Sequence, residues 1–295
     1  MTPITVLPPL PARPVDGHKG MFGRVLVVGG REEMIGAPVM AGTSALRSGA
    51  GLVQVAAPRA ILSAALSITP ELIGLGLGNG RGKDQLLAMA QKADAVVIGP
   101  GMGQSTEAAG RVARLVRLDK PMVIDADALN LLAAGKRWPT HFKAHAVLTP
   151  HPGEMKRLAR LIDRDEVPSD QDGRIEIAAA AARAFGQVIV LKGYRTVVTD
   201  ADRVYINDTG DSSLSKAGTG DVLSGIVGTM LAQQMDPLSA AIAAVWIHGR
   251  AGEIAGQRLG RRCVLARDVI DALPQAIEQY EHSDPGPGVA RASRP

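Results

Sequence analysis

The sequence predicts an α/β protein of three layers, in which helices cover both faces of a central, mainly parallel sheet. Short aliphatic runs such as Arg24–Val28 and Val188–Leu191 have the continuous apolar character of strands that are buried on both faces. These runs alternate with segments of helical spacing, as they do in βα units. Hydrophobic residues form 46% of the chain but aromatic residues only 3%, so the core must be aliphatic.

The alternation begins near residue 24 and continues through the chain. Strands are expected where Val-, Ile- and Leu-rich runs end in Gly, Pro, Asp or Lys, namely at Arg24–Val28, Leu52–Ala56, Ala95–Ile98, Pro121–Asp125, Ala146–Thr149 and Val188–Leu191. Two further runs, Thr196–Thr199 and Arg203–Ile206, are typical of a hairpin. Helices are expected at Ala37–Ser48, Thr106–Arg117, Asp221–Gln233, Pro237–Ala255 and Ala266–Glu281.

The length of 295 residues fits one large α/β domain, which we place at residues 20–282. Residues 1–19 are rich in proline and lack periodicity, which indicates an extended lead-in. Residues 283–295 consist mostly of Pro, Gly, Ser and Arg, a composition that favours a disordered tail.

The charge pattern and the single cysteine limit the classes of function. The net charge of +4 comes from scattered basic residues, and no basic stripe is interleaved with aromatics, so nucleic-acid binding is not favoured. Cys263 has no partner for an intrachain disulfide, which fits a reducing compartment. No signal peptide or membrane span is recognisable. We therefore expect a soluble cytoplasmic protein that binds no membrane.

The loop Ala217–Asp221, with the sequence Ala-Gly-Thr-Gly-Asp, precedes a predicted helix and has the character of an anion site. Gly218 and Gly220 allow the backbone to approach a ligand closely, and the free N–H groups at the helix start favour a phosphate. Asp221 would repel a phosphate, but it fits a base that takes a proton from a hydroxyl about to attack that phosphate. Read alone, Asp221 is more simply a helix cap.

Unusual residues follow four predicted strands, and parallel strands would gather them at one edge of the sheet. Lys192–Thr196 indicates either a nucleotide pocket or a surface turn. In Thr149–Glu154, two prolines fix the direction of His151, which is otherwise an ordinary turn histidine. Gly99–Gly103 has almost no side chains, so it suits either a flat ligand or a tight turn.

Carboxylates and a histidine elsewhere leave further alternatives open. Asp125–Asn130 could act through the hydration shell of Mg²⁺ or cap a helix; we favour capping for Asp127 and leave Asp125 open. His248 lies in an Ala-rich helical stretch and is interpreted as a packed or interface histidine. The chain has no Walker A sequence or Cys/His metal cluster, and the Gly-rich run Gly74–Gly78 shows no strand-turn-helix context.

Together these segments resemble the ADP/ATP-dependent (S)-NAD(P)H-hydrate dehydratases in their stand-alone form, from about His18 to about Leu273. The segments that carry the resemblance are Gly23–Gly30, Gly36–Ala41, Ala45–Val53, Gly99–Gly103, Asp125–Asn130, Thr149–Glu154, Lys192–Thr196 and Ala217–Gly225. The Gly-x-Gly-Asp loop is shared across the ribokinase-like superfamily, whereas its combination with Thr149–Glu154 and Gly99–Gly103 is more specific.

The resemblance implies a ribokinase-like fold and a repair reaction in nicotinamide nucleotide metabolism. NADH and NADPH are damaged by hydration of the nicotinamide ring to NADHX and NADPHX. The enzyme phosphorylates the ring hydroxyl of the S-hydrate and eliminates phosphate, which restores the reduced cofactor. Residues 20–282 would then be a single catalytic domain.

The resemblance also implies roles for individual residues. Asp221 would be the base, and it would contact the hydrate together with Ala37, Gly103 and His151. The backbone of Gly218, Thr219 and Gly220 would hold the transferred phosphate. The nucleotide, ADP or ATP, would be lined by residues 211–220 and by Lys192, Gly193, Tyr194, Arg195 and Thr196.

The cofactor and partners follow from the same resemblance. Mg²⁺ would bridge the nucleotide phosphates through residues that the sequence does not identify. The family leads us to expect a homotetramer. An NAD(P)HX epimerase, often fused before this domain, would here be a separate protein. Asp211 departs from the small residues that the family often has there and adds a charge near the phosphates, so its role stays open.

Two other functions remain as alternatives at this stage. A ribokinase-like kinase of a thiazole or pyrimidine alcohol would use the same Asp221 and anion site but release a stable phosphate ester. A nucleotide sensor would keep the fold without turnover. The pair Thr149–Glu154 and Gly99–Gly103 favours the dehydratase over the kinase, and the intact Asp221 speaks against the sensor.

Overall fold

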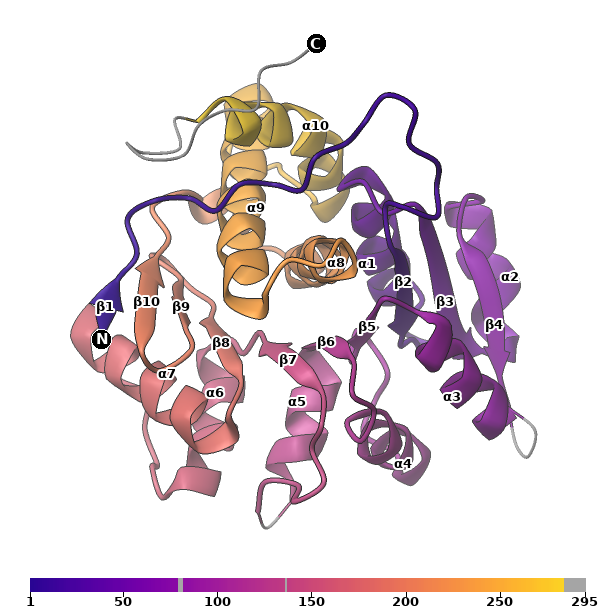
Figure 1. The fold of residues 1–295 in the computed structure, drawn as a ribbon, viewed down its shortest axis with the longest axis horizontal. Helices are drawn as coiled ribbons and strands as arrows, with labels where there is room; N and C mark the ends of the chain where they lie inside the picture. The colour runs from indigo at the N-terminus through magenta and orange to yellow at the C-terminus, as the bar shows by residue number, and fades with distance from the viewer. Residues whose placement is uncertain (79–81, 136, 284–295) are drawn as a thin grey trace.

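The computed structural model describes residues 1–78, 82–135 and 137–283, and within them the three-layer prediction is confirmed (Figure 1). Ten strands form one sheet in the order β1-β10-β9-β8-β7-β6-β5-β2-β3-β4. Their bounds are β1 Thr2–Pro3, β2 Arg24–Val28, β3 Leu52–Pro58, β4 Ile73–Leu77, β5 Ala95–Ile98, β6 Pro121–Ile124, β7 His145–Leu148, β8 Val188–Leu191, β9 Val197–Thr199 and β10 Arg203–Ile206. Among these strands only β9 runs antiparallel to its neighbours, which makes the expected hairpin with β10.

Two groups of helices cover the sheet. The helices on one face are α1 Gly36–Arg47, α2 Arg59–Ile68, α8 Thr219–Ala232, α9 Pro237–Leu259 and α10 Ala266–His282. Those on the other face are α3 Gly82–Lys92, α4 Thr106–Leu115, α5 Ala126–Ala133, α6 Pro152–Ala159 and α7 Gln171–Phe185. Figure 1 shows α8 and α9 above the strands and α4, α5, α6 and α7 below them.

A hydrophobic core lies on each face of the sheet, and successive side chains of a strand point alternately into one core and the other. In β2, Val25 and Val27 belong to the core under α8, whereas Leu26 and Val28 belong to the core under α4 and α5. Both faces of the strand are therefore apolar, which explains the unbroken run of aliphatic residues in the sequence.

Helix α8 lies directly on the centre of the sheet because its glycines permit close contact. A β-carbon on Gly228 would lie 2.5 Å from a methyl group of Val97 in β5, and one on Gly225 would lie 2.1 Å from the Ala41 carbonyl oxygen of α1. These approaches place the first turn of α8, which carries Asp221, at the carboxyl ends of β5 and β6.

Several elements differ from the sequence prediction. The run Gly74–Gly78 is itself mostly strand, because its residues 74–77 belong to β4, which pairs with β3. Helix α3 begins a few residues later, at Gly82. Within the proline-rich lead-in, Thr2–Pro3 pairs with β10, and the Tyr280 hydroxyl donates to the Pro8 carbonyl at 2.7 Å. The predicted disordered tail lies outside the described residues, apart from Ser283. No helix in the described ranges combines the length and apolar character of a membrane span.

Candidate active site

The carboxyl ends of four adjacent strands bring the predicted motifs to one edge of the sheet. Gly99–Gly103 follows β5, Asp125 follows β6, Thr149–Glu154 follows β7 and Lys192 follows β8. The start of α8 reaches the same edge, because the Ser224 hydroxyl donates to Asp125 Oδ2 at 2.7 Å. The expectation that strand ends gather these residues is met by this geometry.

Asp125 and Lys192 form a buried ion pair at the centre of this edge. Lys192 Nζ donates to Asp125 Oδ1 at 2.8 Å and lies 3.7 Å from Glu154 Oε2. Burial alone would raise the pKa of Asp125, but the charge of Lys192 and the hydrogen bonds from Lys192 and Ser224 hold it below its ordinary value. Burial likewise opposes the charge of Lys192, but Asp125 and Glu154 raise its pKa, so both groups are charged.

The ammonium group of Lys192 also lies next to the Gly-x-Gly-Asp loop. A β-carbon on Gly220 would lie 3.5 Å from Lys192 Nζ. Gly218 has a φ of +92°, a left-handed conformation that glycine adopts without strain, and it occupies the N-cap position of α8. The free backbone N–H groups of this helix start and the lysine therefore form one cationic surface that suits a phosphate.

Asp221 is not the helix cap that its sequence context suggests, since Gly218 takes that position and Asp221 is the third residue of the helix. Burial raises the pKa of Asp221 to about 7, and the negative charges of Asp125, Asp127 and Glu154 add to this rise, while Lys192 opposes it. A carboxyl group with such a pKa can take up and release a proton near neutral pH, as a general base must.

His151 and Glu154 form a reciprocal cap on α6. The backbone N–H groups of Gly153 and Glu154 donate to His151 Nδ1 at 3.0 and 3.3 Å, and the His151 backbone N–H donates to Glu154 Oε2 at 2.8 Å. Burial, Lys192 and Arg157 lower the pKa of His151, so its imidazole is neutral at pH 7 and carries its proton on Nε2. The side chain is 52% exposed, and its Nε2 lies 3.4 Å from Glu154 Oε1, so a ligand on the solvent side can compete for the Nε2–H.

Asp127 holds the glycine-rich loop and does not cap a helix, which corrects our interpretation of this residue. The Gly103 backbone N–H donates to Asp127 Oδ2 at 2.8 Å. Asp125, which we left open, stands at the N-cap position of α5 without a capping hydrogen bond from its side chain. Ala37 reaches the same loop, because its β-carbon would lie 3.0 Å from a β-carbon on Gly101.

A cavity of about 350 Å³ opens beside the start of α8. Its lining residues come from the β8–β9 turn, the segment after β10, α8 and α9: Lys192, Gly193, Tyr194, Thr196, Asn207, Thr209, Gly210, Asp211, Ser212, Leu214, Ser215, Thr219, Gly220, Leu223, Val245, His248 and Gly249. Of the residues predicted to bind nucleotide, five do not line this cavity: Arg195, Ser213, Lys216, Ala217 and Gly218. Such a volume suits a small-molecule ligand.

Sequence reasoning missed part of this cavity wall. Asn207 donates to the backbone oxygens of Thr209 and Val245 at 2.9 and 3.2 Å, which fixes the segment after β10 against α9. His248 is packed, as expected, but it also lines the cavity, and burial lowers its pKa to about 4. The sequence could not show this, because one histidine in an Ala-rich helix has the same pattern whether it only packs in the core or also lines a cavity.

The open question about Asp211 also has a structural answer. Its Oδ1 accepts from the Ser213 backbone N–H at 2.9 Å and caps the short 3₁₀ helix η2 Ser212–Leu214. Its Oδ2 accepts from Arg261 Nε at 2.6 Å. The charge of Asp211 is thus neutralised by Arg261 at the cavity rim.

Comparison with known proteins gives the relatives of this chain. A sequence profile described as NAD(P)H-hydrate dehydratase matches residues 25–275. The ADP-dependent (S)-NAD(P)H-hydrate dehydratase of Neisseria meningitidis is 37% identical over 255 residues, covering 84% of this chain and 82% of that protein. The bifunctional NAD(P)H-hydrate repair enzyme of Moorella thermoacetica is 40% identical over 281 residues, or 92% of this chain and 52% of the enzyme. The chain thus spans about half the length of such bifunctional relatives.

Solved structures agree with the sequence relatives. The ADP/ATP-dependent NAD(P)H-hydrate dehydratase of Bacillus subtilis, co-crystallised with ATP and Mg²⁺, has a TM-score of 0.79 and 32% identity, covering 92% of this chain and 95% of that one. A hydroxyethylthiazole kinase from Pyrococcus horikoshii has a TM-score of 0.62 at 17% identity, a similarity of fold alone. The fold is ribokinase-like, and the chain belongs to the NAD(P)H-hydrate dehydratase family.

Proposed function

We propose that this protein repairs hydrated nicotinamide nucleotides by the ADP- or ATP-dependent dehydration of S-NADHX and S-NADPHX to NADH and NADPH. The observation that carries the proposal is the position of Asp221. It lies in the first turn of α8, at the edge where His151, the Gly103 loop and the nucleotide-sized cavity meet, and its pKa is about 7. The membership of the dehydratase family supports this reaction over that of a vitamin-precursor kinase.

The chemistry follows from these groups. Asp221 takes the proton of the ring hydroxyl, whose oxygen attacks the terminal phosphorus of the nucleotide, and AMP leaves when ADP is the donor or ADP when ATP is the donor. The backbone N–H group of Gly220 and the ammonium of Lys192 stabilise the charge on the transferred group. The ring nitrogen then expels phosphate as the adjacent ring carbon loses a proton, which regenerates the dihydronicotinamide.

The two substrates occupy opposite sides of Asp221 in this proposal. The nucleotide lies in the cavity along Lys192–Thr196, with its phosphates at Gly218–Gly220. The hydrate lies against Ala37, Gly103 and the Nε2–H of His151, so that its hydroxyl reaches Asp221. The small residues of Gly99–Gly103, held by Asp127, offer a flat backbone surface for the nicotinamide ring.

We infer that Mg²⁺ enters with the nucleotide. Among the described residues no group of three or more His, Cys, Asp or Glu side chains is placed to hold a metal ion, and the ammonium of Lys192 already neutralises Asp125. Phosphate oxygens and water are ordinary ligands of Mg²⁺, and they would hold it here, where it supplies charge neutralisation to the phosphates. The ATP and Mg²⁺ of the Bacillus subtilis crystals support this inference.

The cellular setting is also a proposal. We propose that the protein acts in the cytoplasm as a homotetramer and that an epimerase activity supplies the S-hydrate from its R-epimer. The bifunctional names of relatives such as that of Moorella thermoacetica support a pairing of two repair activities.

The test is to incubate the protein with NADHX, Mg²⁺ and either ADP or ATP, and to follow absorbance in the NADH band. We expect recovery of NADH that depends on nucleotide, with release of one phosphate per NADH. Mass spectrometry of the product separates the alternatives: a stable phosphate ester would indicate a kinase. The absence of both products would contradict an enzymatic function on this substrate.

A further inference from the structure

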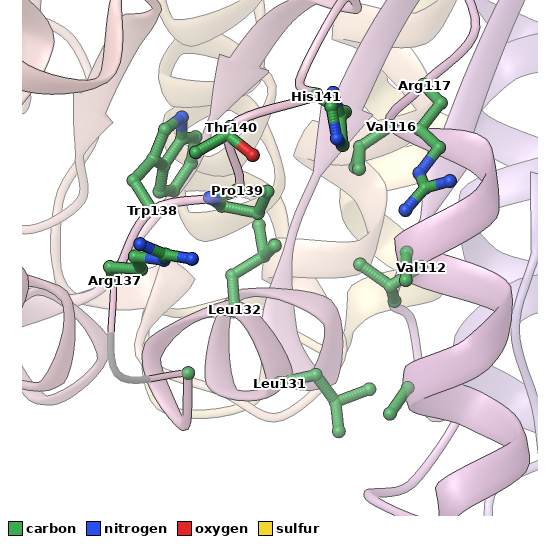
Figure 2. A pocket seen from close by; sticks show the side chains of 13 residues that line it. Val112, Val116, Arg117, Leu131, Leu132, Arg137, Trp138, Pro139, Thr140 and His141 are labelled. Carbon is green, nitrogen blue, oxygen red and sulfur yellow. The ribbon is translucent and has the colours of Figure 1, made fainter.

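A second cavity lies at the opposite edge of the sheet from the candidate active site. Its volume is about 370 Å³, and it opens between the last turns of α4 and α5 and the segment that connects α5 to β7 (Figure 2). The N-cap of helix α5 is Asp125, next to Lys192, and the helix runs away from this pair, so Leu132 in its last turn lies at the far end. The cavity is therefore separate from the nucleotide site.

The floor and one wall of this cavity are apolar and firmly packed. Val112, Val116 and Leu132 are buried side chains that face it. The ring of Trp138 forms a wall, and it is stacked on Phe142 at 4.9 Å and on Phe185 at 4.2 Å between ring centroids. The whole chain has only two Trp and three Phe, so most of these residues gather at this wall. A flat apolar group would replace water on these surfaces favourably.

The rim of the cavity is cationic. Arg117 and Arg137 stand on opposite sides of it, with His141 at the edge between them (Figure 2). Among the described residues, none of those that line the cavity is acidic, and neither arginine forms an ion pair or a side-chain hydrogen bond. Other arginines of this chain, such as Arg203 and Arg250, are paired with carboxylates.

We propose that this cavity binds a small organic anion with a flat apolar body, such as an aromatic carboxylate. The apolar body would lie against Trp138, Val112 and Leu132, and the acid group would lie between the guanidinium groups of Arg117 and Arg137. Guanidinium groups match carboxylate geometry, and the cavity volume of about 370 Å³ lies in the range of small-molecule sites. The proposal does not depend on the reaction at Asp221.

A pair of fluorescent probes tests the two parts of the proposal, binding of an apolar body and binding of a negative charge. 1-Anilinonaphthalene-8-sulfonate carries a flat apolar body and one negative charge, and N-phenyl-1-naphthylamine is its neutral counterpart. Titrations are made in saturating ADP, which keeps the probes out of the nucleotide cavity. We expect one equivalent of the sulfonate to bind at least about tenfold more tightly than the neutral probe.

Substitutions in the cavity lining test whether the sulfonate probe binds in this cavity. The double substitution Arg117→Ala and Arg137→Ala should weaken sulfonate binding at least about tenfold. The control Arg114→Ala, in the last turn of α4 but outside the lining, should leave sulfonate binding unchanged. The substitution Ala113→Phe fills the exposed mouth and should abolish binding of both probes. Thermal unfolding of each variant checks that the fold is retained. Equal binding of both probes, or sulfonate binding that survives the double substitution or Ala113→Phe, would overturn the proposal.

Discussion

Lys192 Nζ lies 2.8 Å from Asp125 Oδ1, and this contact joins the ends of β6 and β8 across 67 positions of the sequence. The side chain of Asp125 is 2% exposed and that of Lys192 is 20% exposed. Ser224 binds the second oxygen of Asp125, so the pair also fixes the first turns of α8. One buried contact therefore connects the proposed phosphate site with the strand ends that form the active-site edge.

Removal of Asp125 should destabilise the protein strongly, because it leaves the ammonium of Lys192 buried without its partner. We expect Asp125→Ala to lower the free energy of unfolding by about 3–5 kcal/mol and Asp125→Asn by less, since the amide oxygen still accepts a hydrogen bond. Urea denaturation measures both values. The exposed Asp202→Ala serves as the control and should change stability by less than about 0.5 kcal/mol. A loss as small as that of the control in Asp125→Ala would contradict the role of the pair.

The rate of dehydration should depend on the protonation of Asp221. Only the carboxylate form can accept the hydroxyl proton, so kcat/KM should rise as the pH increases through about 7. Asp221→Asn should lose at least about 10²-fold in kcat and still bind ADP. Initial rates across pH 5.5–9, chosen as about 1.5–2 units on each side of the pKa, and calorimetric titration with ADP check these expectations. A variant that retains the full rate would remove Asp221 from the mechanism.

The same residue should make the unliganded protein less stable at high pH. The folded-state pKa of about 7 exceeds the ordinary value of 3.8, so the folded chain holds a proton that the unfolded chain releases in this interval. The free energy of unfolding therefore decreases as the pH rises from about 4 to about 7, and the full decrease is reached above pH 7. Asp221→Asn should stabilise the protein by about 2 kcal/mol at pH 8 and have little effect at pH 4. Urea denaturation at the two pH values measures the difference, and equal effects would contradict the raised pKa.

Substitution of Asp127 should weaken binding of the hydrate and leave binding of the nucleotide unchanged. Asp127→Ala removes the acceptor of the Gly103 N–H, which frees the Gly99–Gly103 loop. The loss of one charged hydrogen bond, about 1.5–3 kcal/mol, should raise the KM for NADHX about tenfold or more. The Kd for ADP on the same variant is the internal control. An increase of the Kd for ADP by the same factor would show a general loss of structure.

The sequence predicted an element correctly where its local hydrophobic pattern matches the burial of that element in the structure. The apolar runs of β2, β5 and β8 were predicted at their observed bounds because strands buried on both faces have only apolar side chains. Strand β4 was missed because two of its five residues, Gly74 and Gly76, are glycines, which weaken an isolated strand. Pairing with β3 supplies the missing stability.

Short-range patterns in the sequence were enough to predict the alternation of strands and helices and the family of the chain. The gathering of motifs at one edge followed once this alternation indicated a parallel sheet. The tertiary structure decided the partners of charged side chains. Asp127 was expected to cap a helix, but its carboxylate accepts a hydrogen bond from the Gly103 N–H. Asp221, read alone, was expected to cap α8, but Gly218 occupies the N-cap position of that helix. The reason is physical: the energy of a buried charge depends on groups brought near it by packing, such as Lys192 beside Asp125, and not on its neighbours in the sequence.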